Sequence, residues 1–343
     1  MLAMDVFSGD AFKAISLTGS VNKLGYVPGF LGTVPNLIIP KPVRTSSIYI
    51  EERTQGPRLI QTSPRGAPPS RVGGTRATAR SFKTVRLSEA SRIDSEELES
   101  IRAFGSETEL KQLQGEVAER QAKIKADHEL TREHMRLGLV QGLVLDADGS
   151  VIRDWYDEFE QAKAPEIVFE FSKTVDDGSF HQKCNDIRRG MLQSLQGLGG
   201  GNVTIHALCG DEFFDGMVRS AEVRDTYKFS TRAIDLQNDV GGAYESFRFG
   251  QIMWHNYRGT DDNSTVTVPS DEVKLFPAGA DIFQMAQAPA EGFGFNGTLG
   301  LETYSWIVRD KDRDQWADIE VNSYPLPVCT MPQALRSGSL KAA

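Results

Sequence analysis

The chain has 343 residues, of which 39% are hydrophobic and 25% are charged, as in an ordinary folded domain. That length can bury one sizeable core or two. The formal net charge of -9 argues against a general nucleic-acid binder. No apolar run is long enough for a transmembrane helix, and the first residues do not have the pattern of a secretory signal.

Charge is distributed unevenly along the chain. Residues 41–92 contain 11 basic and 3 acidic side chains, a net charge of +8, whereas the rest contains 27 basic and 44 acidic side chains, a net charge of -17. The sequence therefore places one basic segment in an acidic protein.

Residues 1–40 combine frequent glycine and proline with apolar residues such as Phe30 and Leu31. The glycines and prolines argue against a long helix or strand, and the apolar residues argue against a solvated tail. We expect an arm that packs on its own domain or on a neighbouring subunit.

Residues 46–62 and 81–91 alternate as strands do, around a stretch rich in proline, glycine and arginine. This pattern predicts a long hairpin or extended loop. Its tip lacks the apolar residues needed to fold on a core of its own, so we expect it to be disordered or docked on a partner.

Residues 94–141 are expected to form a long helix, with capping-box patterns at Asp94–Glu97 and Ser106–Glu109. Its apolar positions are few and fall on one narrow stripe. This pattern indicates a helix that rests on a surface by one edge and is not buried in the core, with a coiled coil as the alternative.

The remaining segments predict a compact α+β part. We expect helices at residues 180–197 and 211–225 on either side of a buried strand at residues 202–210. Short strands and turns should fill residues 230–300, and a strand, a charged turn and a strand should follow.

The stretch "GLVLDADGSVIRD" (142–154) is similar to the nucleophile strand of haloacid-dehalogenase-type phosphatases, in which Asp146 would attack phosphorus. Such a strand belongs to a doubly wound parallel sheet. The segments here favour antiparallel hairpins instead, so we interpret Ala147–Gly149 as a hairpin turn and expect no enzyme.

No other motif indicates chemistry. The five histidines lack metal-ligand spacing, and the glycines at 197–201 end a helix and do not form a phosphate loop. Cys184, Cys209 and Cys329 are scattered, so we expect buried, reduced thiols. We therefore predict no catalytic, cofactor-binding or metal-binding residue.

Three stretches together resemble the lambda-type major capsid proteins of tailed phages, the major capsid protein E family. They are "REHMRLGLVQGLVLDADGSVIRDWYDEF" (132–159), "KLFPAGADIFQMAQAPA" (274–290) and "EVNSYPLPVCTMPQAL" (320–335). The resemblance covers most of residues 45–335. It implies an HK-ninety-seven-like capsid fold with an N-terminal arm, an extended loop, a peripheral domain with a spine helix, and an axial domain.

The segments fit that order as follows: arm, 1–44; extended loop, 45–92; peripheral domain, 93–175, with the spine helix at about 94–141; axial domain, 176–312; and return to the peripheral domain with a C-terminal tail, 313–343. The implied function is a major capsid protein that self-assembles into hexamers and pentamers of an icosahedral head. A neck or tail protein, or a phosphatase using Asp146, is the alternative.

The resemblance also implies partners. These are further copies of the chain, a separate scaffolding protein, the portal protein, packaged double-stranded DNA and a possible decoration protein, with no membrane. Assembly is expected in the cytoplasm of the bacterial host. We predict that Arg71, Arg76 and Arg80, near the tip of the basic loop, contact acidic residues of a neighbouring subunit.

Overall fold

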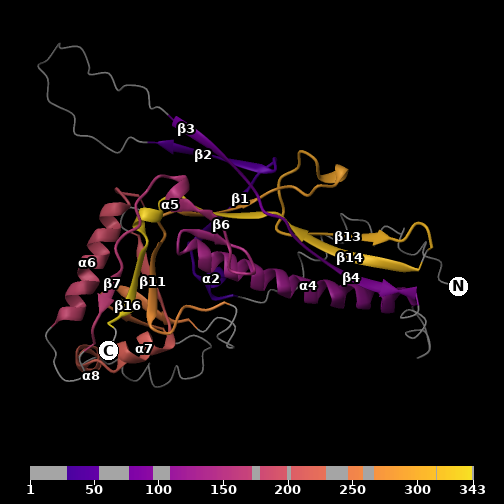
Figure 1. Ribbon diagram of the computed structural model, residues 1–343. Helices are drawn as coiled ribbons and strands as arrows, with labels where there is room; N and C mark the ends of the chain where they lie inside the picture. The colour runs from indigo at the N-terminus through magenta and orange to yellow at the C-terminus, as the bar shows by residue number, and fades with distance from the viewer. Residues whose placement is uncertain are drawn as a thin grey trace, which may run out of the picture.

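The computed structural model describes residues 29–53, 77–95, 109–171, 178–198, 202–228, 246–257, 266–313 and 315–341. Within them, a sheet with three helices lies at one end, a long helix with a second sheet extends from it, and a two-stranded hairpin projects away from both (Figure 1). The class is α+β, as predicted.

The largest sheet has six strands in the order β7-β16-β11-β8-β10-β9. Most neighbours are antiparallel, but β10 pairs with β8, and β16 with β7, in parallel. The strands are β7 (Ile167–Phe169), β8 (Thr204–Cys209), β9 (Ser246–Phe249), β10 (Ile252–Asn256), β11 (Glu272–Ala278) and β16 (Arg336–Leu340). The sheet therefore collects segments from both halves of the chain.

Helix α6 (Ser179–Ser194) packs on this sheet through one stripe of apolar residues. The stripe has the spacing of four, three and four that places side chains on one helix face: Phe180, Cys184, Ile187 and Met191. The shorter helices α7 (Asp211–Val218) and α8 (Ala221–Lys228) follow β8. The first predicted helix and the buried strand are confirmed, whereas the single helix predicted at residues 211–225 is divided into α7 and α8 at Arg219 and Ser220.

The start of α6 is capped by a residue from another helix. Gly178 precedes the helix and has no side chain that could accept a hydrogen bond. Instead, the buried carboxylate of Glu222 on α8 accepts hydrogen bonds from the backbone N–H of Phe180 (3.0 Å) and of His181 (2.7 Å). Two of the donors left unpaired at a helix start are thereby satisfied across helices.

Helix α4 (Glu109–Leu139) runs beside the second sheet, whose order is β13-β14-β4. The strands are β4 (Leu87–Asp94), β13 (Tyr304–Arg309) and β14 (Trp316–Ser323). Ile124 packs on Val321, and Gln121 donates to the Ser305 hydroxyl at 2.9 Å. Since Asp94 is the last residue of β4, the long helix does not include it. Glu109 is the first described residue of α4, and Glu97 and Ser106 lie outside the described chain.

The prediction that this helix touches a surface by one edge was wrong for its last turns. Leu137 and Leu139 belong to the main core, and the charged residues Glu129, Arg132 and Glu133 are also buried. The pattern misled because buried carboxylates and guanidinium groups that pair with each other occupy positions that usually carry apolar side chains.

The arm enters a small central sheet of order β1-β12-β15. Its strands are β1 (Ile38–Pro42), β12 (Phe283–Gln287) and β15 (Pro325–Cys329), with β1 parallel to β12. The short helix α2 (Phe30–Thr33) precedes β1, and Leu31 and Leu37 are almost fully buried in the main core. In residues 29–42, the arm therefore packs on its own chain.

A hairpin is present where the sequence predicted one. β2 (Ser47–Arg53) and β3 (Ala77–Lys83) are antiparallel, from Ser47 opposite Lys83 to Arg53 opposite Ala77. The predicted second strand at 81–91 is divided between β3 and β4, however, and β4 pairs with β14 instead. Phe82 is 3% exposed and meets the rings of Trp155 (5.1 Å between centroids) and Phe159 (6.1 Å) at the short helix α5 (Trp155–Glu158). The tip, residues 54–76, lies outside the described chain.

Strand pairing brings together segments that are far apart in the chain. β7 and β16 lie in the six-stranded sheet, and β13 pairs with β14 beside α4. The chain crosses between the two sheets repeatedly, and partners far apart in sequence decide which sheet a strand joins. The division into peripheral and axial domains stays a prediction.

Removing the aromatic anchor of the hairpin should destabilise the protein. We expect Phe82→Ala to lower the free energy of unfolding by about 3–5 kcal/mol, because it empties the site between Trp155 and Phe159. Denaturant unfolding would measure this. Tyr49→Ala on the exposed face of β2 is the control and should change stability by less than about 1 kcal/mol; equal losses would contradict the packing argument.

Neutralising the cap on α6 should also cost stability. We expect Glu222→Ala to lower the free energy of unfolding by about 1–3 kcal/mol, since it leaves the buried Phe180 N–H and the partly buried His181 N–H without an acceptor. Glu166→Ala, at an exposed position, is the control. Faster hydrogen exchange of the Phe180 and His181 amides in Glu222→Ala alone would identify the cause, and unchanged exchange would refute it.

Candidate functional site

Arg80 is the only one of the three arginines predicted for subunit contact that lies in the described chain; Arg71 and Arg76 lie outside it. Its Nη2 atom is 3.1 Å from Oε1 of Glu160, and its Nη1 atom donates to the backbone carbonyl of Glu158. Arg80 therefore binds its own chain just after α5. A contact with a neighbouring subunit stays a prediction for all three residues.

This contact belongs to a group of residues that we call the hairpin clasp: Phe82 and Arg80 on β3, with Arg153, Glu158 and Glu160. Arg153 pairs with Glu158 at 2.8 Å, and its guanidinium lies 5.4 Å from the centre of the Phe82 ring. Glu160 has a φ of +52°, which is uncommon for a residue with a side chain. The clasp fixes the direction in which the hairpin leaves the body.

A second charged group lies along the buried side of α4. Arg132 is 2.8 Å from Glu129 and 2.7 Å from Glu302, and it also donates to the backbone carbonyl of Glu302. Arg136 is 3.3 Å from Glu133 and 3.8 Å from Glu129. Removing one member of such a network would leave a buried charge uncompensated.

Glu133 also joins distant segments. Its Oε1 atom accepts a hydrogen bond from the backbone N–H of Leu31 at 2.7 Å and another from the Tyr257 hydroxyl at 3.2 Å. The arm, the long helix and the segment after β10 therefore meet at one buried carboxylate. No sequence pattern marked Glu133 as buried, because a glutamate in a charged helix is normally solvated.

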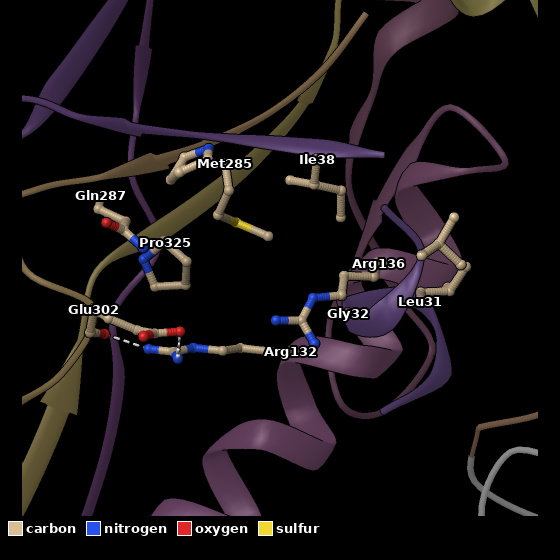
Figure 2. Close-up of a pocket in the computed structure, with 11 residues that line it drawn as sticks. Leu31, Gly32, Ile38, Arg132, Arg136, Met285, Gln287, Glu302 and Pro325 are labelled. Atoms are coloured by element: carbon tan, nitrogen blue, oxygen red, sulfur yellow. Dashed lines mark hydrogen bonds and ion pairs between the residues drawn. The ribbon is translucent and has the colours of Figure 1, made fainter. Parts of the chain in front are cut away.

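Beside this network is a cavity of about 160 Å³. Figure 2 shows Arg132 bound to Glu302 at one side, with the Arg136 guanidinium reaching toward the same space and Met285 and Pro325 across from it. The cavity is lined by Leu31, Gly32, Val34, Ile38, Pro40, Arg132, Arg136, Met285, Gln287, Glu302 and Pro325. The lining contains no serine, cysteine, histidine or lysine, and its one carboxylate, Glu302, is paired with Arg132.

Two histidines that are far apart in sequence meet between β8 and β10. Nδ1 of His206 is 3.0 Å from Nε2 of His255, and the rings stack with 6° between their planes. Burial lowers the pKa of His206 to about 4 and that of His255 to about 3, so both rings are neutral at pH 7. Among the described residues, no group of three or more potential metal ligands exists.

Asp146 lies in a hairpin turn between β5 (Leu143–Leu145) and β6 (Val151–Asp154), as predicted. Its N–H donates to the Ser150 carbonyl at 2.9 Å, and Asp148 Oδ1 accepts from the Ser150 N–H at 2.8 Å. Gly149 has a φ of +82°, which explains the glycine at this position. The phosphatase alternative was wrong.

The three cysteines are buried free thiols, as predicted. Burial raises the pKa of Cys329 to about 12, and it raises the pKa of Cys184 and Cys209 well above the ordinary value. None is a reactive thiolate at neutral pH. In the part of the chain that the structure describes, no helix is long and apolar enough to cross a membrane.

Comparison with known proteins identifies the family to which this chain belongs. Residues 13–340 match the family described as phage major capsid protein E. The chain is 25% identical to the major capsid protein of Salmonella phage Felix O1 (isolate Felix O1-VT1), over 94% of this chain and 95% of that protein. It is 24% identical to the major capsid protein of Pseudomonas phage KPP10, over 91% and 93% of the two chains.

Solved structures agree on the fold. A prophage capsid protein from E. coli CFT073 superposes with a TM-score of 0.55 at 15% identity, covering 96% of this chain and 99% of that one. A phage-related protein from Bordetella bronchiseptica RB50 gives 0.50 at 12% identity, covering 96% and 97%. The family match decides against an enzyme and against a neck or tail protein. The chain belongs to the phage major capsid protein E family and has its HK-ninety-seven-like fold, so it is a structural subunit of a phage head.

Proposed function

We propose that copies of this subunit form the hexamers and pentamers of the head by reaching onto one another with the β2–β3 hairpin. The observation that carries this proposal is the hairpin itself, which is anchored at its base by the clasp and projects beyond the body (Figure 1). A ribbon that leaves its own core has to find its contacts on another molecule.

Charge supports the choice of partner. Residues 41–92 carry a net charge of +8 and the rest of each copy carries -17, so the basic segment of one subunit is attracted to the remainder of a neighbouring one. Single exposed ion pairs contribute roughly 0–1 kcal/mol, but the shell repeats each contact in every subunit. Complementary charge also determines which faces meet.

The same proposal assigns parts of the chain to the two domains of the fold. The six-stranded sheet with α6, α7 and α8 would be the axial domain, and α4 with the β13-β14-β4 sheet would be the peripheral domain. A separate scaffolding protein, the portal protein, a decoration protein and packaged DNA would be the other partners, with assembly in the bacterial cytoplasm.

Reversing the charge of the basic loop should block assembly without unfolding the subunit. We expect Arg71→Glu with Arg76→Glu to leave the circular dichroism unchanged and to prevent closed shells, as seen by sedimentation and electron microscopy. Arg80→Glu is tested separately because Arg80 also pairs with Glu160. The double variant Arg189→Glu with Arg219→Glu, at exposed helix positions, makes an equal change of charge and should still assemble.

Each result distinguishes a different contact. Normal shells of Arg71→Glu/Arg76→Glu with unchanged salt tolerance would contradict docking on a neighbour. Normal shells that package DNA poorly would instead assign the loop to the DNA-facing side. Failure of both double variants would show a general sensitivity to charge and would also count against a specific contact.

A further inference from the structure

The loop between β12 and β13 presents apolar side chains to solvent. Phe293, in a 3-10 turn at Phe293–Phe295, has a relative exposure of 102%, so it makes almost no contact with its own chain. Leu299 and Leu301, in the same loop, are also exposed. Large apolar side chains gathered on one exposed loop mark an interaction site more often than a solvated loop.

The loop is held in place from within. Phe295 turns inward onto the Tyr304 ring, with 4.9 Å between centroids, while its neighbour Phe293 points out. The Thr298 hydroxyl donates to the Phe295 carbonyl at 2.7 Å, and the Leu301 N–H donates to the Tyr304 hydroxyl at 2.7 Å. A fixed loop loses little conformational freedom when it binds, which favours affinity.

The loop is also tied to the start of the hairpin. The Gly300 N–H donates to the Val43 carbonyl at 2.9 Å, and Arg44 donates to the Gly297 carbonyl at 3.1 Å. A Cβ atom at Gly300 would collide with the Gln287 carbonyl, so only glycine permits this approach. The loop and the base of the β2–β3 hairpin therefore move as one surface.

The composition of the loop restricts its partner. Residues 288–303 contain two charged side chains, Glu291 and Glu302, and no lysine or arginine. Such a surface does not suit the phosphates of packaged DNA or an anionic membrane. An apolar protein surface is the matching chemistry.

We propose that the 291–303 loop is a subunit contact in which Phe293 of one copy is buried against a second copy of this chain. The inference rests on the proposed assembly through the hairpin, because the loop is fixed to residues 43 and 44, directly before that hairpin. In a shell made of many identical subunits, the protein surface presented repeatedly to this loop is another copy. The loop adds an apolar anchor to the charged contacts of the hairpin.

The direct test replaces Phe293 with a photo-crosslinking benzoylphenylalanine. In assembled particles, illumination should convert the subunit into covalent dimers, whereas free subunits at low concentration should stay monomeric. Leu198, exposed after α6, is the control position for the same crosslinker and should give at least about tenfold less dimer. Mass spectrometry of the dimer would locate the receiving surface.

A second variant measures the strength of the contact. Phe293→Ser should raise the subunit concentration needed for half-maximal assembly at least about tenfold, the size of effect typical of a central interface residue. Phe293→Leu should retain most of the affinity. Because Phe293 is fully exposed, both variants should unfold at the wild-type temperature, so loss of folding would not explain the result.

Three outcomes would overturn the inference while leaving the proposed function intact. They are wild-type shells without dimer crosslinks, crosslinks to a different protein, and normal assembly of Phe293→Ser. If the wild-type chain formed no shells under any assembly condition, the proposed function itself would fail. The two failures are therefore distinguishable.

Discussion

The buried carboxylate of Glu133 is the point at which three distant parts of the chain are held together. It accepts the Leu31 N–H from the arm and the Tyr257 hydroxyl from the segment after β10, and it pairs with Arg136 on its own helix. Buried ionised groups are retained only when partners satisfy them, and so each of these segments has to lie where it does. The position of the arm, and with it β1 and the start of the hairpin, depends on this carboxylate.

The need to pair buried charges also explains why the last turns of α4 contain both glutamate and arginine. These turns carry buried glutamate and arginine side chains that pair with one another, beside the core residues Leu137 and Leu139. An apolar interface tolerates sliding of one element over another, but a paired network loses its hydrogen bonds when the register changes. We interpret α4 as a rigid support between the two sheets for that reason.

The β2–β3 hairpin and the 291–303 loop both project from the body, and their side chains differ in kind. The hairpin carries arginines and is held by the clasp around Phe82, whereas the 291–303 loop carries Phe293 and no basic residue. Both leave the body at nearly the same place, since Val43 and Arg44 hold the loop directly before β2. Charge would orient neighbouring subunits, and apolar burial would hold them.

What the sequence determined by itself was local. Periodicity predicted α6, its buried partner strand β8 and the hairpin strand β2, and Asp148 with Gly149 predicted the turn that excluded a phosphatase. Three stretches of residues also carried the family resemblance, and the family match confirmed it. These signals were readable because each depends on residues near one another in the chain.

Tertiary structure alone decided which segments meet. β16 joined β11 and β7, His206 stacked on His255, and Arg80 paired with Glu160 across 80 residues. The sequence could not predict the burial of Glu129, Arg132 and Glu133. A charged side chain is expected to be solvated unless its partner is known. Pairing between residues far apart in sequence leaves no periodic pattern, and it fixes both the strand order of the sheets and the buried charges of this capsid subunit.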